Sequence, residues 1–239
     1  MMTHIPTSEQ IFQSNFSSNV RMLNSAKIKI NREINRFLRK GDESSVQIYT
    51  NLYLLIYSSW AEASLVKLVH TPSGFSLDEK KEIFKDRDVL NRWKKCVNIA
   101  FSKYRKQGSE IPNKKKKIHK MLDDYLKSQG NIRNKIAHGQ WSYTLHKNNI
   151  TYDGNAQALV DCIDVMQIET WFEILKQIID IVLGLVDSRE HNDHYAHYHF
   201  YFDKLTKVQS IIEERRKWTL EDKVNRLKLK PITFNNNPS

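Results

Sequence analysis

The strongest constraint on the fold is a pair of long helix-periodic segments at the start of the chain. Over residues 8–39 the apolar side chains recur at roughly helical intervals, and Gly41 and Asp42 then end the pattern. Residues 44–70 are far more apolar, and their length and periodicity argue against a strand. The sequence therefore predicts an all-α fold, built as an antiparallel helical bundle.

Few turn-forming residues interrupt this pattern. The 239 residues include seven Gly and five Pro, which favours long helices over many short strands. After a break at TPSG, Ser76 and Glu79 fit a capping box that opens a third helix toward Lys106, kinked or split over residues 86–88. Residues 107–112 should form a loop.

The second half of the chain should contain more of the helical core and a C-terminal addition. Asn113 is placed to cap a short fourth helix ending in LKSQG, and YTLHKNNITYD alternates as a small β-hairpin or an irregular loop would. Residues 167–188 predict a strongly apolar core helix, after which the composition becomes His- and Tyr-rich and then charged. We expect one helical domain over residues 1–188 and a C-terminal helical extension with a flexible tail over 189–239.

The net charge of +11 is concentrated in one window. Eleven basic residues and a single acid, Glu110, lie between Arg92 and Lys120, and this window supplies nearly all of the excess. A solvated helix face is one interpretation, and a surface for a polyanion, most often nucleic acid, is the other. The run KKKK places cations in the first turn of the fourth helix, against its dipole, which folding does not require.

The stretch NIRNKIAHGQW follows the basic window, and we interpret it as a helix start. As a helix it places Ile132 and Ile136 on a side that faces the core. Asn134, His138 and Trp141 would then lie together on the opposite side. The stretch therefore combines a packing face with a face of hydrogen-bonding groups.

Arg133 and His138 are the candidate reactive pair within that stretch. Five residues separate them, so a regular helix sets them about 140° apart and one chain does not aim both at one point. A two-fold axis would bring each Arg near the partner's His, or Arg133 would precede the regular helix and fold back. Gly139 leaves the backbone beside His138 bare, which allows close approach by a ligand or a second chain.

Arg133, Asn134 and His138, within R-N-K-I-A-H-G, resemble the R-x4-6-H signature of HEPN-domain proteins. HEPN motifs also commonly have a polar residue directly after the Arg and the ending A-H-G, and both are present here. HEPN folds are antiparallel helical bundles with this motif near the start of a late helix. The apolar second helix, with its lone acid Glu62, is also similar to several prokaryotic HEPN groups. The resemblance covers residues 8–188, and outside the motif it is only a pattern of helices.

The resemblance implies a metal-independent endoribonuclease that acts as a homodimer, with two motifs lining one cleft. The RNA 2′-OH would attack the adjacent phosphorus and leave a 2′,3′-cyclic phosphate and a 5′-OH. His138 would transfer the proton, because imidazole titrates near neutral pH. Arg133 would bind the non-bridging oxygens, and Asn134 would orient His138 or the phosphate. Such domains serve as toxins or antiviral defence effectors, and a cytoplasmic location is expected.

Glu62 and a set of lysines complete the candidate site. Glu62 lies in an apolar helix, where an unpaired carboxylate is costly, so it either faces solvent or pairs with a cation such as Arg133. Contacts to the RNA backbone are expected from the basic residues near the motif, Lys114, Lys115, Lys116, Lys117, Lys120 and Lys135. Gln140 stands where some HEPN toxins carry a Tyr that an antitoxin nucleotidyltransferase modifies, so that form of control is not expected. A different regulatory protein partner stays open.

We expect no metal and no cofactor in the site, because no carboxylate cluster accompanies the motif. The segment HNDHYAHYH would place three imidazoles on one side of a helix. A zinc site, an interface or RNA-stacking surface, and ordinary packing are the alternatives for it. Its four histidines are His191, His194, His197 and His199.

Other classes of protein have less support from the sequence. Cys96 and Cys162 are expected to be buried thiols in a reducing compartment. No signal peptide is expected, and charged residues interrupt the most apolar segment, 171–186, so no membrane association is expected either. Two alternative functions remain, a HEPN-like dimer that holds RNA or a protein without cutting, and a structural helical protein whose basic patch binds DNA or a membrane surface.

Overall fold

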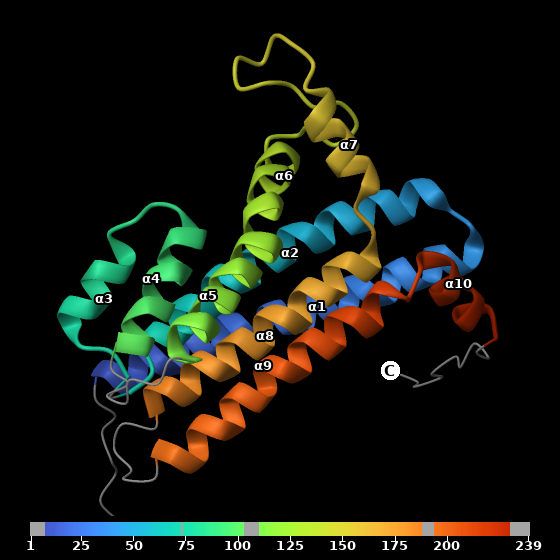
Figure 1. The fold of residues 1–239 in the computed structure, drawn as a ribbon. Helices are drawn as coiled ribbons and strands as arrows, with labels where there is room; N and C mark the ends of the chain where they lie inside the picture. Colours follow the sequence, from blue (N-terminus) through green and yellow to red (C-terminus); the bar gives the residue numbers. More distant parts are fainter. Residues whose placement is uncertain (1–7, 73, 103–109, 188–193, 230–239) are drawn as a thin grey trace, which may run out of the picture.

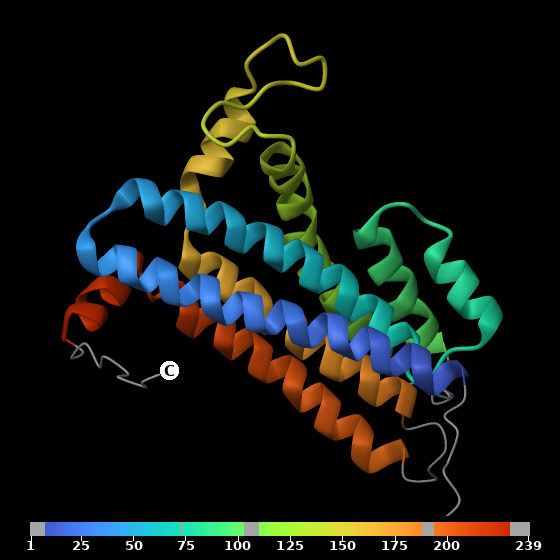
Figure 2. The same cartoon turned by 180° about the vertical axis from the view of Figure 1, so that it is seen from behind.

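The computed structural model describes residues 8–72, 74–102, 110–187 and 194–229, and this part of the chain is all-α, as predicted. The elements are α1 (Ser8–Lys40), α2 (Glu43–Val69), α3 (Leu77–Phe84), α4 (Val89–Ser102), α5 (Glu110–Leu122), the π-helix η1 (Asp123–Lys127), α6 (Ser128–Ala137), α7 (Gly154–Cys162), α8 (Val165–Asp187), α9 (His194–Arg216) and α10 (Leu220–Leu229). Long helices α1, α2, α8 and α9 run side by side and form the body (Figure 1). The view from behind shows α6, the loop 138–153 and α7 projecting from this body (Figure 2). We call these three segments the arm.

Helix α2 is the central core helix. Its Tyr53, Tyr57 and Trp60 surround Phe172 of α8, with ring centroids 5.0–5.4 Å from that of Phe172. Each such aromatic pair contributes about 0.5–1.5 kcal/mol beyond the area that it buries. By length and composition alone α2 could cross a membrane, but core helices of soluble proteins pass the same test, and 50% of its apolar window is buried here.

The predicted boundaries of α1 and α2 and the predicted start of α3 are confirmed. Gly41, at φ +69°, ends α1, and the Asp42 carboxylate accepts a hydrogen bond from Ser45 N at 3.0 Å to cap α2. The capping box is present, since Ser76 N donates to Glu79 Oε2 at 2.7 Å and Glu79 N donates to Ser76 Oγ at 3.3 Å. The predicted split between α3 and α4 is also present.

The prediction of a loop followed by a short fourth helix was wrong. Helix α5 already begins at Glu110, so Asn113 is not its cap, while residues 103–109 lie outside the described part. The helix does not end at LKSQG either, because the π-helix carries it through Gly130 to Ala137. A π turn leaves one carbonyl without its usual partner in the helix, and the Tyr57 hydroxyl donates to the Tyr125 carbonyl at 2.8 Å. The motif therefore belongs to the end of one continuous helix.

The segment predicted as a hairpin or an irregular loop is a hairpin-shaped loop. Leu145 and Tyr152 form a single antiparallel bridge, and the loop contains no strand. Asn149, at φ +55°, makes the turn, and its N–H donates to the His146 carbonyl at 2.9 Å. Helix α7, which the sequence analysis did not predict, follows this loop. The thiol of Cys162 at its end is exposed rather than buried, in contrast to Cys96.

Helix α9 packs on α8 within the body, and α10 packs on α1 and α8. Leu205 and Val208 of α9 are buried. Lys223 of α10 reaches Glu169 of α8 at 2.7 Å, and Arg39 Nε donates to the Leu227 carbonyl at 3.1 Å. The histidine-rich segment cannot be placed in this packing, because the side chains of residues 191–199 lie outside the described ones.

Candidate functional site

The motif lies at the C-terminal end of α6, so the prediction that it opens a helix was wrong. His138 is the C-cap residue, and Gly139 follows it in the left-handed region at φ +80°. Gly139 N donates to the Ile136 carbonyl at 3.1 Å, and Gln140 N donates to the Lys135 carbonyl at 3.0 Å. These two bonds form a Schellman motif, in which glycine is preferred because it has no Cβ. The sequence A-H-G thus has a structural role as a helix stop.

The faces of α6 agree in part with the helical projection. Ile132 and Ile136 are buried, as predicted. Trp141 lies beyond the helix end, where its indole N–H donates to the Ile136 carbonyl at 2.8 Å, so it does not continue the polar face. Arg133 is part of regular helix, which excludes the alternative in which it precedes the helix. Its Nη1 donates to Asn134 Oδ1 at 3.0 Å, so the guanidinium leans toward the face of Asn134.

Two hollows flank α6. The larger, about 1280 Å³, lies between α6, the loop and α7, and is lined by His138, His146 and Lys135 among others. We call it the histidine hollow. The smaller, about 610 Å³, is lined by Arg133 together with residues of α2 and of the α3–α4 connection, and we call it the arginine hollow. Arg133 and His138 therefore open into different hollows, as their angular separation predicted.

Two asparagines connect the hollows. Asn131 and Asn134 line both of them. Asn134 also accepts the hydrogen bond from Arg133 and lies one helical turn before His138. Side chains four residues apart on a helix are neighbours, so the amide of Asn134 stands between the guanidinium and the imidazole.

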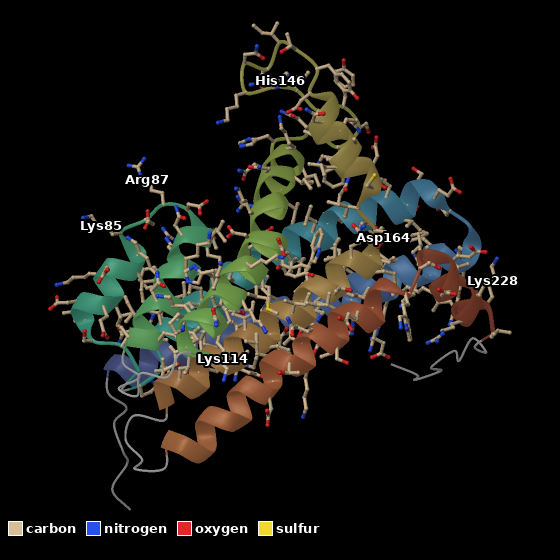
Figure 3. All side chains as sticks on the ribbon, in the orientation of Figure 1. Lys85, Arg87, Lys114, His146, Asp164 and Lys228 are labelled. Atoms are coloured by element: carbon tan, nitrogen blue, oxygen red, sulfur yellow. The ribbon has the colours of Figure 1, made fainter. Side chains whose placement is uncertain are left out.

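The charged groups of the arginine hollow include Glu62. Its carboxylate pairs with Arg92 Nη1 at 3.3 Å and not with Arg133. The Glu62 side chain is 44% exposed, so the cost of burying an unpaired carboxylate does not arise. Lys127 and Arg87 also line this hollow, and Arg87 projects from the α3–α4 connection in Figure 3. Sequence reasoning missed both cations, because only the tertiary fold brings them beside Arg133.

The histidine hollow contains a network around Asp153. Lys135 Nζ lies 3.2 Å from Asp153 Oδ2 and donates to the Leu145 carbonyl, while His146 Nδ1 lies 3.6 Å from the same carboxylate oxygen. Asp153 also caps α7 by accepting from Ala156 N at 3.0 Å. That backbone hydrogen bond, with the help of Lys135 and His146, lowers the pKa of the Asp153 carboxyl. The charge of Lys135 is thus engaged within the protein, which limits the RNA contact predicted for it.

The lysine run is distant from the motif. Lys114, Lys115, Lys116, Lys117 and Lys120 lie on α5, at the other end of the continuous helix. At 1.5 Å per residue, Lys117 is about 30 Å from His138 along the axis. Figure 3 shows Lys114 on α5, near the body, and His146 in the arm.

Part of the basic window is neutralised within the protein. Arg92 pairs with Glu62, as described above, and two other cations of the window meet carboxylates from outside it. Lys94 Nζ lies 2.6 Å from Asp123 Oδ1, and Lys95 Nζ lies 2.6 Å from Asp86 Oδ2. The basic surface is therefore smaller than the sequence count implies.

The loop of the arm also presents aromatic surface. Tyr143 and Tyr152 stack with ring centroids 4.7 Å apart and planes 25° apart, and both are exposed.

Among the described residues, no group of three or more His, Cys, Asp or Glu side chains could hold a metal ion.

The structure thus shows an all-α protein with Arg133, Asn134 and His138 at a helix end, between the arginine hollow and the histidine hollow. Comparisons with protein-family models, curated proteins and solved structures found no match for this chain. The function is therefore inferred from the chemistry of the site and from the motif.

Proposed function

We propose that this protein is a metal-independent endoribonuclease with a bundle of HEPN type. One observation carries the proposal: Arg133, Asn134 and His138 lie together on the last turns of α6, where the arginine hollow and the histidine hollow adjoin. The core helix α8 follows the motif in the chain, as the resemblance implies, although the motif ends its helix instead of opening one. A role as a toxin or antiviral defence effector in the cytoplasm rests on the resemblance alone.

The chemistry follows from the residue types. A base removes the proton of the RNA 2′-OH, the 2′-oxygen bonds to phosphorus, and the bond from phosphorus to the 5′-oxygen breaks. His138 is exposed at the edge of its hollow, so it can transfer a proton to or from a bound substrate. Arg133 and the cations near it can stabilise the negative charge on the non-bridging oxygens. The products are a 2′,3′-cyclic phosphate and a 5′-OH. No step requires a metal ion.

A homodimer is proposed together with this activity. Arg133 and His138 open into separate hollows of one chain, so a two-fold axis beside α6 would let one phosphate meet the Arg of one protomer and the His of the other. The hydrogen bond from Arg133 to Asn134 offers a second geometry, in which one chain supplies both groups across the asparagine pair. The lysines of α5 contact RNA in either geometry if the strand follows the long helix.

His138→Ala provides the test. Cleavage of a labelled RNA by the full-length protein in excess chelator should fall by about 10²–10⁴-fold, while RNA affinity stays within about threefold, because general acid–base catalysis is lost and binding is not. Lys228→Ala, at an exposed lysine of α10 that lines neither hollow, should cleave like the wild type. An RNA with a 2′-deoxy residue at the scissile position should resist cleavage. Intact RNA with the wild-type protein, or cleavage only with added divalent metal, would contradict the proposal.

A second candidate is a module that binds RNA without cutting it. The exposed stacked pair of Tyr143 and Tyr152 favours it, because aromatic faces bind bases without any proton transfer. This candidate predicts that the wild type and His138→Ala bind RNA equally and that neither releases a cyclic phosphate.

A further inference from the structure

We propose that His146 is a second catalytic residue, which protonates the leaving 5′-oxygen while His138 accepts the proton of the 2′-OH. This proposal rests on the endoribonuclease function proposed above. It makes the histidine hollow of a single chain a complete acid–base site for an RNA phosphodiester. The motif itself contains one imidazole, and the loop that follows the motif supplies the other.

The loop is docked on the end of α6 so that His146 faces the motif. Leu145 N donates to Gln140 Oε1 at 2.8 Å, and the Leu145 carbonyl accepts from Lys135 Nζ. Both groups of Leu145 are thereby held by residues at the C-terminal end of α6. His146 is the next residue and lines the same hollow as His138.

Lys135 and Asp153 relate the positions of the two imidazoles. Lys135 and His138 are three residues apart and share one face of α6, where side chains are neighbours. Lys135 Nζ is 3.2 Å from Asp153 Oδ2, and His146 Nδ1 is 3.6 Å from the same oxygen. His138 and His146 thus lie on either side of one ammonium–carboxylate pair, with the open hollow beside them.

Asp153 acts as a positioning residue for His146. Its carboxylate accepts a hydrogen bond from Ala156 N at the start of α7 and pairs with Lys135. The position of this carboxylate is therefore fixed independently of His146. With Nδ1 turned to this carboxylate, His146 presents Nε2 for proton transfer. The charged groups around His146 are Asp153 and Lys135, with Lys147 adjacent and His138 across the hollow. An imidazolium paired with a carboxylate suits the role of proton donor.

The step balances without a further reactant. The 2′-oxygen bonds to phosphorus as its proton passes to His138, and the bond from phosphorus to the 5′-oxygen breaks as His146 gives its proton to that oxygen. One proton enters and one leaves the pair of histidines, and no oxidation or reduction occurs. Exchange with water restores both imidazoles for the next turnover.

Changing the leaving group of the substrate distinguishes a catalytic role of His146 from a purely structural one. His146→Ala in the full-length protein should cleave ordinary RNA about 10²-fold more slowly, with RNA affinity within about threefold of wild type. An RNA whose scissile 5′-oxygen is replaced by sulfur has a leaving group that needs no proton. His146→Ala should cleave this substrate within about threefold of the wild-type rate, whereas His138→Ala should remain slow on both substrates.

The controls separate this proposal from the function on which it rests. Ile150→Ser changes the exposed tip of the same loop, outside the hollow, and should leave both rates unchanged. His146→Gln serves as a second variant if His146→Ala alters the unfolding temperature. Wild-type rates on ordinary RNA for both His146 variants, or a defect that the sulfur substrate does not relieve, would overturn the role of His146 and leave the endoribonuclease intact. No cleavage by the wild-type protein would overturn both proposals.

Discussion

The left-handed backbone of Gly139 fixes where the imidazole of His138 stands. At φ +80° a residue with a Cβ is strained, yet a Cβ built at Gly139 would meet no heavy atom within 4 Å. The requirement for glycine is therefore conformational and does not arise from crowding. It also leaves the backbone beside His138 open, as expected from the sequence.

Replacing Gly139 should separate the conformational role from a catalytic one. Gly139→Ala should lower the free energy of unfolding by about 1 kcal/mol, because alanine adopts a positive φ at a cost, whereas Gly139→Asn should lose less. Urea unfolding measures both variants. Cleavage should fall more for Ala than for Asn if the helix stop positions His138. Unfolding free energies equal to that of the wild type in both variants would show that the helix stop does not need the left-handed conformation.

The candidate site could be predicted from the sequence only where its residues are adjacent in the chain. Arg133, Asn134 and His138 lie within six residues of one another, so one local pattern predicts them together. Lys127 and Arg87 reach the arginine hollow through the π turn and the α3–α4 connection, which no local pattern encodes. Asp153 before Gly154 was a cap signal available in the sequence, and it was missed.

At the scale of the element, the π turn determines which way the motif faces. One extra residue in the turn Asp123–Lys127 rotates everything that follows, so Ile132 and Ile136 meet the core while the Arg and His face outward. The Tyr57 hydroxyl stabilises this turn through the Tyr125 carbonyl. Burial raises the pKa of the Tyr57 phenol, which keeps it a neutral donor.

Two tyrosines on α2 provide a matched test of that contact. Tyr57→Phe should lower the unfolding free energy by about 0.5–1.5 kcal/mol, because it removes the half-buried hydrogen bond to the Tyr125 carbonyl. Tyr53, one turn earlier, is equally buried, and its hydroxyl has no hydrogen-bond partner among the described residues. Tyr53→Phe should therefore be neutral or stabilising. Equal losses in chemical denaturation would show that the π turn does not depend on the Tyr57 hydroxyl.

Helices with an uninterrupted apolar period were predicted well, whereas the helix through the motif was not. Helices α1, α2 and α8 begin and end within two residues of their predicted limits. The segment LKSQG resembles a helix end, since Gly130 costs about 1 kcal/mol relative to Ala inside a helix. Burial of Leu126 and Ile132 on either side of Gly130 offsets that cost, and this burial is a tertiary effect that local sequence does not show.

At the scale of the whole molecule, the lysine run and His138 occupy opposite ends of the continuous helix from α5 to α6. This helix places about 30 Å between Lys117 and His138. An RNA strand along the helix would meet the lysines far from its scissile phosphate. Their contribution would therefore be to affinity and salt dependence instead of to the rate of the chemical step.

The stability of the whole molecule should decrease at acid pH. The Asp42, Asp153 and Asp222 carboxyls each have a pKa below the usual 3.8, chiefly because a backbone N–H donates to them, from Ser45, Ala156 and Thr219 respectively. The unfolded chain binds these protons more readily than the folded protein does. Their stabilisation is therefore complete above about pH 5 and is lost as the pH falls through the lowered folded values.

The double variant Asp42→Asn with Asp222→Asn tests this dependence away from the arm. Asparagine keeps the helix caps, because its amide oxygen accepts the same hydrogen bond, but it does not titrate. The unfolding temperature of the wild type should fall more steeply between pH 5 and pH 2 than that of the variant, while the two remain close at pH 7. Parallel curves would place the acid sensitivity in other carboxylates, such as the Glu169 that joins α8 to α10.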